Sequence, residues 1–126
     1  MAGRRTALLT RAIARVAFMA ASVYAVFLAL EPHPPRVLAW DKAEHFLGGA
    51  LIALLALPAL PGLGVGWLVG GLAASAALIE VLQTTMPYGR QGDPADWFAG
   101  VLGAVLVIVL FRAVSRLRAG ATAPRG

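Results

Sequence analysis

Four long apolar stretches, separated by short polar or proline-containing segments, dominate this chain of 126 residues. A helix needs about 20 mostly apolar residues to cross a membrane. Each uncharged stretch is shorter than that, so each helix must include the polar residues at its end. We therefore predict an all-α, integral membrane four-helix bundle within a single domain over 1–119, followed by a disordered tail over 120–126. The predicted helices cover about 12–30, 43–60, 64–85 and 94–113.

The composition supports a membrane protein. Hydrophobic residues make up 60% of the chain and charged residues only 13%, against about 25% in a typical soluble domain. The net charge is +5, but the arginines gather at the two ends without aromatic residues between them, which excludes a nucleic-acid-binding protein. The chain has no cysteine, so disulfides, thiolate metal sites and thiol catalysis are excluded.

The basic residues predict the orientation in the membrane. Four arginines precede residue 16 and four follow residue 111, whereas all six acids lie between positions 31 and 96 with three basic residues. Four spans put both ends on one side, and basic residues favour the cytoplasm. We expect both termini to be cytoplasmic, the acids to lie at the outer face, and the protein to be a multi-pass protein of the cytoplasmic (inner) membrane.

The first apolar stretch has a competing interpretation. Arg4 and Arg5 precede it, and Ala20-Ala21-Ser22 lies within it, a pattern that a cleaved secretory signal also shows. The apolar run continues well past these small residues, so we favour an uncleaved helix.

Small residues recur at spacings that bring helix backbones together in lipid. We expect these stripes to pack the bundle. They are Gly66, Gly70 and Ala74 in the third helix, and Ala99 with Gly103 and Gly100 with Ala104 in the fourth.

The first polar group reads Asp41-Lys42-Ala43-Glu44-His45. Asp41 and His45 are four apart and share a helix face. Asp41 suits an N-cap, with Glu44 placed for a capping box, and Lys42 suits an interface anchor. His45 is either a packed residue or a functional one, because the nearby carboxylate can orient and charge it.

The second group contains Glu80 and, one turn later on the same face, Gln83. Glu80 follows an apolar run. Placing a carboxylate there costs a few kcal/mol of insertion free energy unless the carboxylate meets water or a partner. Glu80 either forms a salt bridge with Arg90 or His45, or acts as a proton acceptor, a cation ligand or a substrate contact.

The third group surrounds the start of the fourth helix. Arg90 suits a carboxylate of the bundle or an anionic headgroup. Asp93 and Pro94 read as an N-cap followed by proline at the first helical position. Asp96 shares a face with Gly100 and Gly103, which turns it toward the bundle.

The candidate binding residues are Asp41, His45, Glu80, Gln83, Arg90 and Asp96. Among them only His45 and Glu80 are candidates for catalysis. No familiar catalytic motif is present. One histidine with four or five carboxylates could hold a divalent cation, but nothing in the spacing demands it, so we predict no metal or other cofactor.

The order and spacing of three motifs resemble the VanZ-like family of small bacterial membrane proteins. They are Asp41-Lys42-x-x-His45-Phe46, Glu80-x-x-Gln83, and Pro87-x-x-Arg90 followed by Asp96 and Gly103, and they cover about residues 41–103. The chain departs from the family at Gly100, where asparagine is common. The resemblance implies a link to the cell envelope and, through the family's namesake, to resistance against the glycopeptide teicoplanin.

Three hypotheses follow. The first is a protein that binds or modulates a membrane lipid, a cell-wall precursor or a glycopeptide antibiotic through an outward-facing polar recess. The second is a membrane enzyme acting on a lipid-linked phosphate or glycan, with His45 as base or nucleophile and Arg90 as anion clamp. The third is a proton or cation pathway. It requires polar groups along the whole membrane span, and the inner halves of the four helices offer almost none. A purely structural role is the remaining alternative, and the sequence gives no oligomeric state.

Overall fold

The computed structural model describes residues 2–87 and 91–121, and these form four α-helices without a strand. The helices are α1 (Ala2–Leu30), α2 (Asp41–Ala59), α3 (Val65–Thr85) and α4 (Pro94–Ala121). All four are long and apolar enough to cross a membrane. The predicted all-α, multi-pass class is thereby confirmed at this level.

The first and last helices of the chain, α1 and α4, are longer than predicted. α1 begins at Ala2 rather than near residue 12, and α4 continues to Ala121 rather than ending near residue 113. Both extensions consist largely of alanine, leucine and arginine, which are strong helix formers. Gly120 and Ala121, predicted to belong to a disordered tail, are therefore helical, while 122–126 lie outside the described residues.

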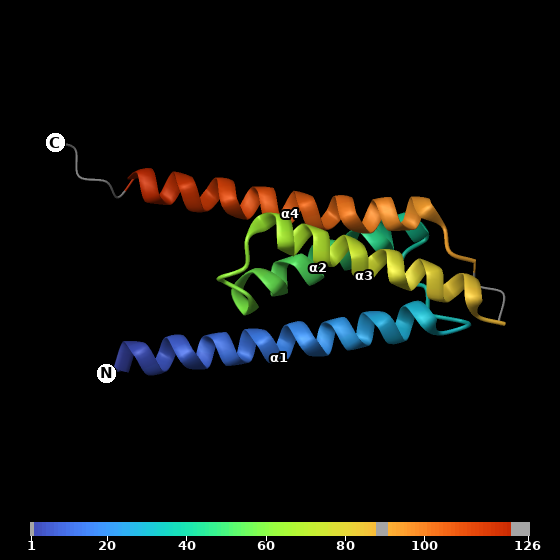
Figure 1. Cartoon of the computed structure of the whole chain (residues 1–126), viewed down its shortest axis with the longest axis horizontal. Coiled ribbons are helices and arrows are strands. Elements are labelled where there is room, and N and C mark those ends of the chain that lie inside the picture. Colours follow the sequence, from blue (N-terminus) through green and yellow to red (C-terminus); the bar gives the residue numbers. More distant parts are fainter. Residues whose placement is uncertain (1, 88–90, 122–126) are drawn as a thin grey trace.

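Successive helices run in opposite directions, so the loops alternate between the two ends of the bundle (Figure 1). The end of α1, the start of α2, the end of α3 and the start of α4 share one end, which we call the polar end. The start of α1 and the end of α4 lie at the opposite end (Figure 1). The acidic groups of the sequence therefore gather at one end of the structure, and the arginines in the first half of α1 and the second half of α4 lie toward the other.

The closest helix pair is α2 and α4, whose backbones touch at two glycines. A Cβ atom added to Gly49 would overlap the carbonyl oxygen of Gly100, and one added to Gly103 would overlap the carbonyl oxygen of Phe46. The predicted packing role of the small residues in α4 is confirmed, since Gly103 and Ala104 are buried. Farther from the polar end, the core continues through buried residues of α2, α3 and α4, which are Ala53, Ala56, Leu57, Leu68, Ala104 and Ile108.

The small-residue stripe of α3 faces away from the bundle, so its predicted packing role is wrong. Gly66, Gly70 and Ala74 are exposed, and a Cβ at either glycine would meet nothing within 4 Å. The core is instead contacted by Leu68 and Leu72. These leucines are two positions out of step with the stripe, which places them on the opposite side of a helix with 3.6 residues per turn.

Two side chains fasten α1 to its neighbours. Arg15 Nε donates to the carbonyl oxygen of Ala59 at 3.1 Å, and Gln83 Nε2 donates to the carbonyl oxygen of Ala29 at 2.8 Å. Both acceptors lie in the last turn of a helix, where carbonyls lack helical partners. The arginine charge also complements the dipole at the end of α2.

Candidate functional site

The side chains of Asp41, Lys42, His45, Glu80, Asp93 and Asp96 form a polar cluster at the polar end. Three of them come from the first turns of α2, two from the start of α4 and the residue before it, and one from α3. The cluster brings together four of the six predicted binding residues. Gln83 is committed to Ala29 and only 3% exposed, and Arg90 lies outside the described residues.

The glycine contact between α2 and α4 explains why the cluster exists. Gly49 follows His45 by four residues, and Gly100 follows Asp96 by four, so each pair shares a helix face. Because the two backbones touch at the glycines, His45 and Asp96 meet one turn closer to the polar end. His45 Nε2 lies 3.6 Å from Asp96 Oδ2.

Lys42 is the centre of the charge arrangement. Its Nζ atom lies 2.7 Å from Asp93 Oδ2 and 2.8 Å from Asp96 Oδ1, so one ammonium joins two carboxylates. The expectation of a simple interface anchor missed this role. A signal was present, since Lys42 precedes His45 by three residues and so shares its face.

His45 also faces a second carboxylate. Its Nε2 atom is 4.0 Å from Asp41 Oδ1, and its side chain is 23% exposed. The 3.6 Å and 4.0 Å separations are both longer than a hydrogen bond between nitrogen and oxygen. Asp41, His45 and Asp96 therefore converge at ion-pair distance without a hydrogen bond between His45 and either carboxylate.

The predicted capping box at the start of α2 is wrong. The helix begins at Asp41, the N-cap position is Trp40, and no side chain caps it. Glu44 instead accepts hydrogen bonds through Oε1 from the backbone N–H groups of Val37 and Leu38, each at 2.6 Å. The capping prediction placed the helix start one residue late, and Glu44 fastens the preceding loop to the helix.

The predicted N-cap of α4 is confirmed. Asp93 Oδ1 accepts a hydrogen bond of 2.8 Å from the N–H of Ala95, and Pro94 is the first helical residue. The hydrogen bond from Lys42, followed by that from the Ala95 backbone, lowers the pKa of the Asp93 carboxyl below its ordinary value. Asp96, at the third helical position, is buried as expected from its face.

The lowered pKa of Asp93 predicts acid sensitivity. A carboxyl whose pKa is lower in the folded state stabilises the fold above its unfolded pKa and loses this contribution as the pH falls through its folded pKa. The thermal stability of detergent-solubilised protein should therefore fall more steeply toward acid for the wild type than for Asp93→Asn, which keeps a capping side chain. Melting curves between neutral pH and pH of about 3 measure this, and parallel pH profiles for both proteins would contradict it.

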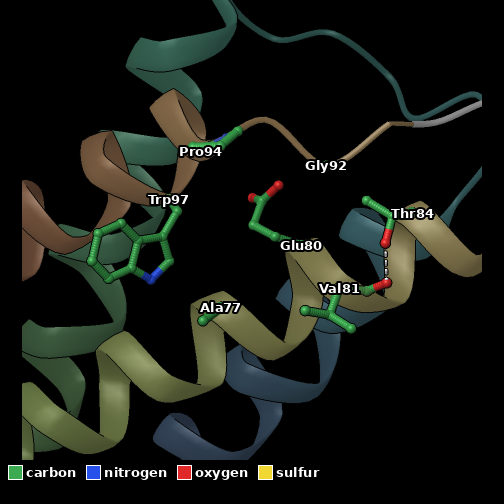
Figure 2. A pocket seen from close by; sticks show the side chains of 7 residues that line it. All are labelled: Ala77, Glu80, Val81, Thr84, Gly92, Pro94 and Trp97. Atoms are coloured by element: carbon green, nitrogen blue, oxygen red, sulfur yellow. Dashed lines mark hydrogen bonds between the residues drawn. The ribbon is translucent and has the colours of Figure 1, made fainter.

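Glu80 binds the loop that leads into α4. Its Oε2 atom accepts a hydrogen bond of 2.7 Å from the backbone N–H of Asp93, so its observed partner is this amide rather than His45. Glu80 also lines a pocket of about 270 Å³ between α3 and the start of α4. Figure 2 shows its carboxylate extending toward Gly92 and Pro94, with Trp97 on the opposite wall. Trp97 is fixed by a hydrogen bond of 2.9 Å from Nε1 to the carbonyl oxygen of Ala73.

A second, larger pocket lies between the first halves of α2 and α4, with a volume of about 680 Å³. We call it the α2–α4 groove. Eight of its nine lining residues are apolar or aromatic, and the ninth is Lys42 of the polar cluster. The lining residues are Trp40, Lys42, Ala43, Phe46, Leu47, Ala95, Phe98, Ala99 and Leu102.

No protein-family model, no curated protein and no solved structure matches this chain. The resemblance to the VanZ-like family accordingly rests on the motifs quoted from the sequence.

Proposed function

We propose that this protein binds an amphipathic, lipid-linked ligand of the cell envelope at the outer face of the cytoplasmic membrane. The apolar chain of the ligand would occupy the α2–α4 groove, and its polar head would lie against the polar cluster. A membrane lipid and a lipid-linked cell-wall precursor share this chemistry. The observation that carries the proposal is that Lys42 belongs both to the groove and to the cluster.

The groove suits an apolar chain. Ligand pockets are mostly apolar, with a few polar groups that fix the orientation of the ligand. Phe46, Phe98 and Leu102 offer aliphatic and aromatic surface, and Lys42 is the one charged residue of the lining. A ligand with a polar head and an apolar tail matches this division.

The distribution of charge supports the outer location. The first half of α1 and the second half of α4, which carry the described arginines of these helices, lie away from the polar cluster (Figure 1). Basic residues flanking membrane spans favour the cytoplasm. An extracytoplasmic polar end gives the cluster access to outer-leaflet lipids and wall precursors, and also to glycopeptide antibiotics, with which the VanZ-like resemblance is associated.

We favour binding over catalysis because the two candidate catalytic residues have separate partners. Glu80 is hydrogen-bonded to the Asp93 backbone, whereas His45 faces Asp41 and Asp96. An enzyme acting through both would need both side chains on one reacting group, and within the cluster each is held by different partners.

Filling the groove tests the proposal. Ala99→Phe places a phenyl ring in the groove, and we expect it to reduce the amount of co-purified lipid or precursor by about tenfold, equivalent to about 1.4 kcal/mol of binding free energy. Native mass spectrometry of protein extracted from membranes measures the bound species and distinguishes a phospholipid from a wall precursor by mass.

Ala74→Phe is the matched control, since Ala74 is exposed on α3 and lines neither pocket. It should retain the bound species at the wild-type level. Equal retention by both variants, with wild-type melting temperatures, would refute a ligand in the groove.

A further inference from the structure

We propose that Asp41, His45 and Asp96 form a binding site for a divalent first-row transition-metal ion, of which Zn²⁺ and Mn²⁺ are the leading candidates. This site goes beyond the proposed function, because it depends neither on the groove nor on the orientation in the membrane. It also differs from the expectation drawn from the sequence, in which no spacing demanded a metal. The three residues come from two helices, and only the packing of α2 against α4 brings them together.

The spacing of the three side chains fits a shared ion. One ligand atom from each residue can be chosen so that all three lie within 4.8 Å of one another. Atoms that bind one ion at about 2.1 Å lie at most about 4.2 Å apart. The 3.6 Å and 4.0 Å separations of His45 Nε2 from the two carboxylates fall inside this limit. The carboxylate oxygens of Asp41 and Asp96 lie within 4.8 Å of each other, so binding one ion requires the 44% exposed Asp41 side chain to turn inward by up to about 0.6 Å.

The groups around the three residues are suited to hold them in place. Lys42 binds Oδ1 of Asp96 at 2.8 Å, which leaves Oδ2 directed toward His45. Hydrogen bonds of this kind orient ligating carboxylates in metal sites. The Asp96 side chain is only 11% exposed, so its position is further restricted by packing.

The charge of the cluster favours a cation. Four carboxylates, those of Asp41, Glu80, Asp93 and Asp96, share the cluster with the single ammonium of Lys42, which pairs with two of them. The cluster therefore keeps an excess of negative charge, which a divalent cation would offset. The imidazole nitrogen favours a transition metal over Ca²⁺ or Mg²⁺, which prefer oxygen ligands. Three protein ligands would leave at least one coordination position for water or another group.

Metal titration of the full chain tests the site. The protein is purified in detergent without a histidine tag, treated with chelator, and titrated with ZnCl₂ and with MnCl₂ by isothermal calorimetry. We expect one saturable site per chain for at least one of the two ions. His45→Ala and Asp96→Asn should each weaken its affinity by at least about tenfold, the lower range for disturbed metal sites.

Two controls separate coordination from general attraction. His33→Ala removes the other histidine of the chain, which is exposed in the loop before α2, and should leave the affinity unchanged. Asp93→Asn removes a negative charge from the same cluster without removing a ligand, and should change the affinity less than Asp96→Asn does.

A loss of affinity in Asp93→Asn as large as that in Asp96→Asn would overturn the proposal, as would the absence of a saturable site in the wild type. If the variants do not fold, Co²⁺ bound to the wild-type protein provides a second measurement. Its visible absorption bands should show nitrogen and oxygen ligands at a single protein site, and a spectrum identical to that of hexaaquo Co²⁺ would also overturn the proposal.

Discussion

Gly49→Ala is expected to lower the free energy of unfolding by about 3 kcal/mol, the upper range for overpacking a tight core. The added methyl group would overlap the carbonyl oxygen of Gly100. The methyl group is attached directly to the backbone of α2, and the oxygen belongs to the backbone of α4. The overlap is therefore relieved only by moving α2 away from α4. Unfolding of the detergent-solubilised protein with a chemical denaturant measures the change.

Gly48→Ala is the matched control for this prediction. Gly48 is the preceding residue of the same helix, and its added Cβ would meet nothing within 4 Å. Alanine is favoured over glycine inside a helix by about 1 kcal/mol, so Gly48→Ala should be neutral or stabilising. Equal effects of the two substitutions would show that the backbones of α2 and α4 do not touch at Gly49.

Gly49→Ala should also affect the candidate site. Gly49 and Gly100 lie one turn from His45 and Asp96, respectively, on the same helix faces. Separation of the helices at the glycines therefore increases the distance between His45 and Asp96, which is 3.6 Å in the native arrangement. Gly49→Ala should weaken metal binding together with stability, whereas Gly48→Ala should weaken neither.

The sequence predicts the number of helices and the start of α4 because apolar length and, at α4, a local cap decide them. Four apolar stretches become four helices, and Asp93 caps α4 through a contact two residues away. Such contacts depend on neighbours in the chain, and a pattern of residue types records them directly.

The sequence does not predict which face of each helix packs against the other helices. Helical periodicity shows that Gly66 and Gly70 share a face, but it does not show whether that face meets a helix or the surroundings. In lipid the usual rule that apolar faces are buried gives no answer, because the outer surface is apolar as well. The bundle uses Leu68 and Leu72 on the opposite face, and the glycines remain outside.

The polar cluster shows the same limit. Periodicity places Asp41 and His45 together, and it also places Asp96 on the packing face of α4. The distances that join α2 to α4 depend on how closely the helices approach, which the glycine contacts set. For this reason the sequence did not predict the pairing of Lys42 with Asp93 and Asp96, although Lys42 and Asp96 stand in the quoted motifs and Asp93 was predicted as an N-cap.

Asp96→Asn is expected to destabilise the protein by about 2 kcal/mol, the typical value for a hydrogen bond to a charged group. The substitution preserves the size of the side chain but removes the charge that faces Lys42 Nζ at 2.8 Å. Because the Asp96 side chain is largely buried, water cannot fully replace the lost contact. Denaturant unfolding in the presence of a chelator measures this cost without any contribution from bound metal.

A double-mutant cycle with Lys42→Met assigns the loss to this pair. Lys42→Met removes the ammonium and leaves Asp93 and Asp96 as neighbouring like charges, so it should also destabilise the protein. Once Asp96 is neutral, that repulsion is reduced, and the double variant should be more stable than the sum of the single effects predicts. Asp41→Asn combined with Lys42→Met is the comparison, because Asp41 makes no ion pair with Lys42 among the described contacts. In this second cycle, the changes in unfolding free energy of the two single variants should be closer to additive. Additivity in both cycles would show that the ion pair between Lys42 and Asp96 does not stabilise the contact between α2 and α4.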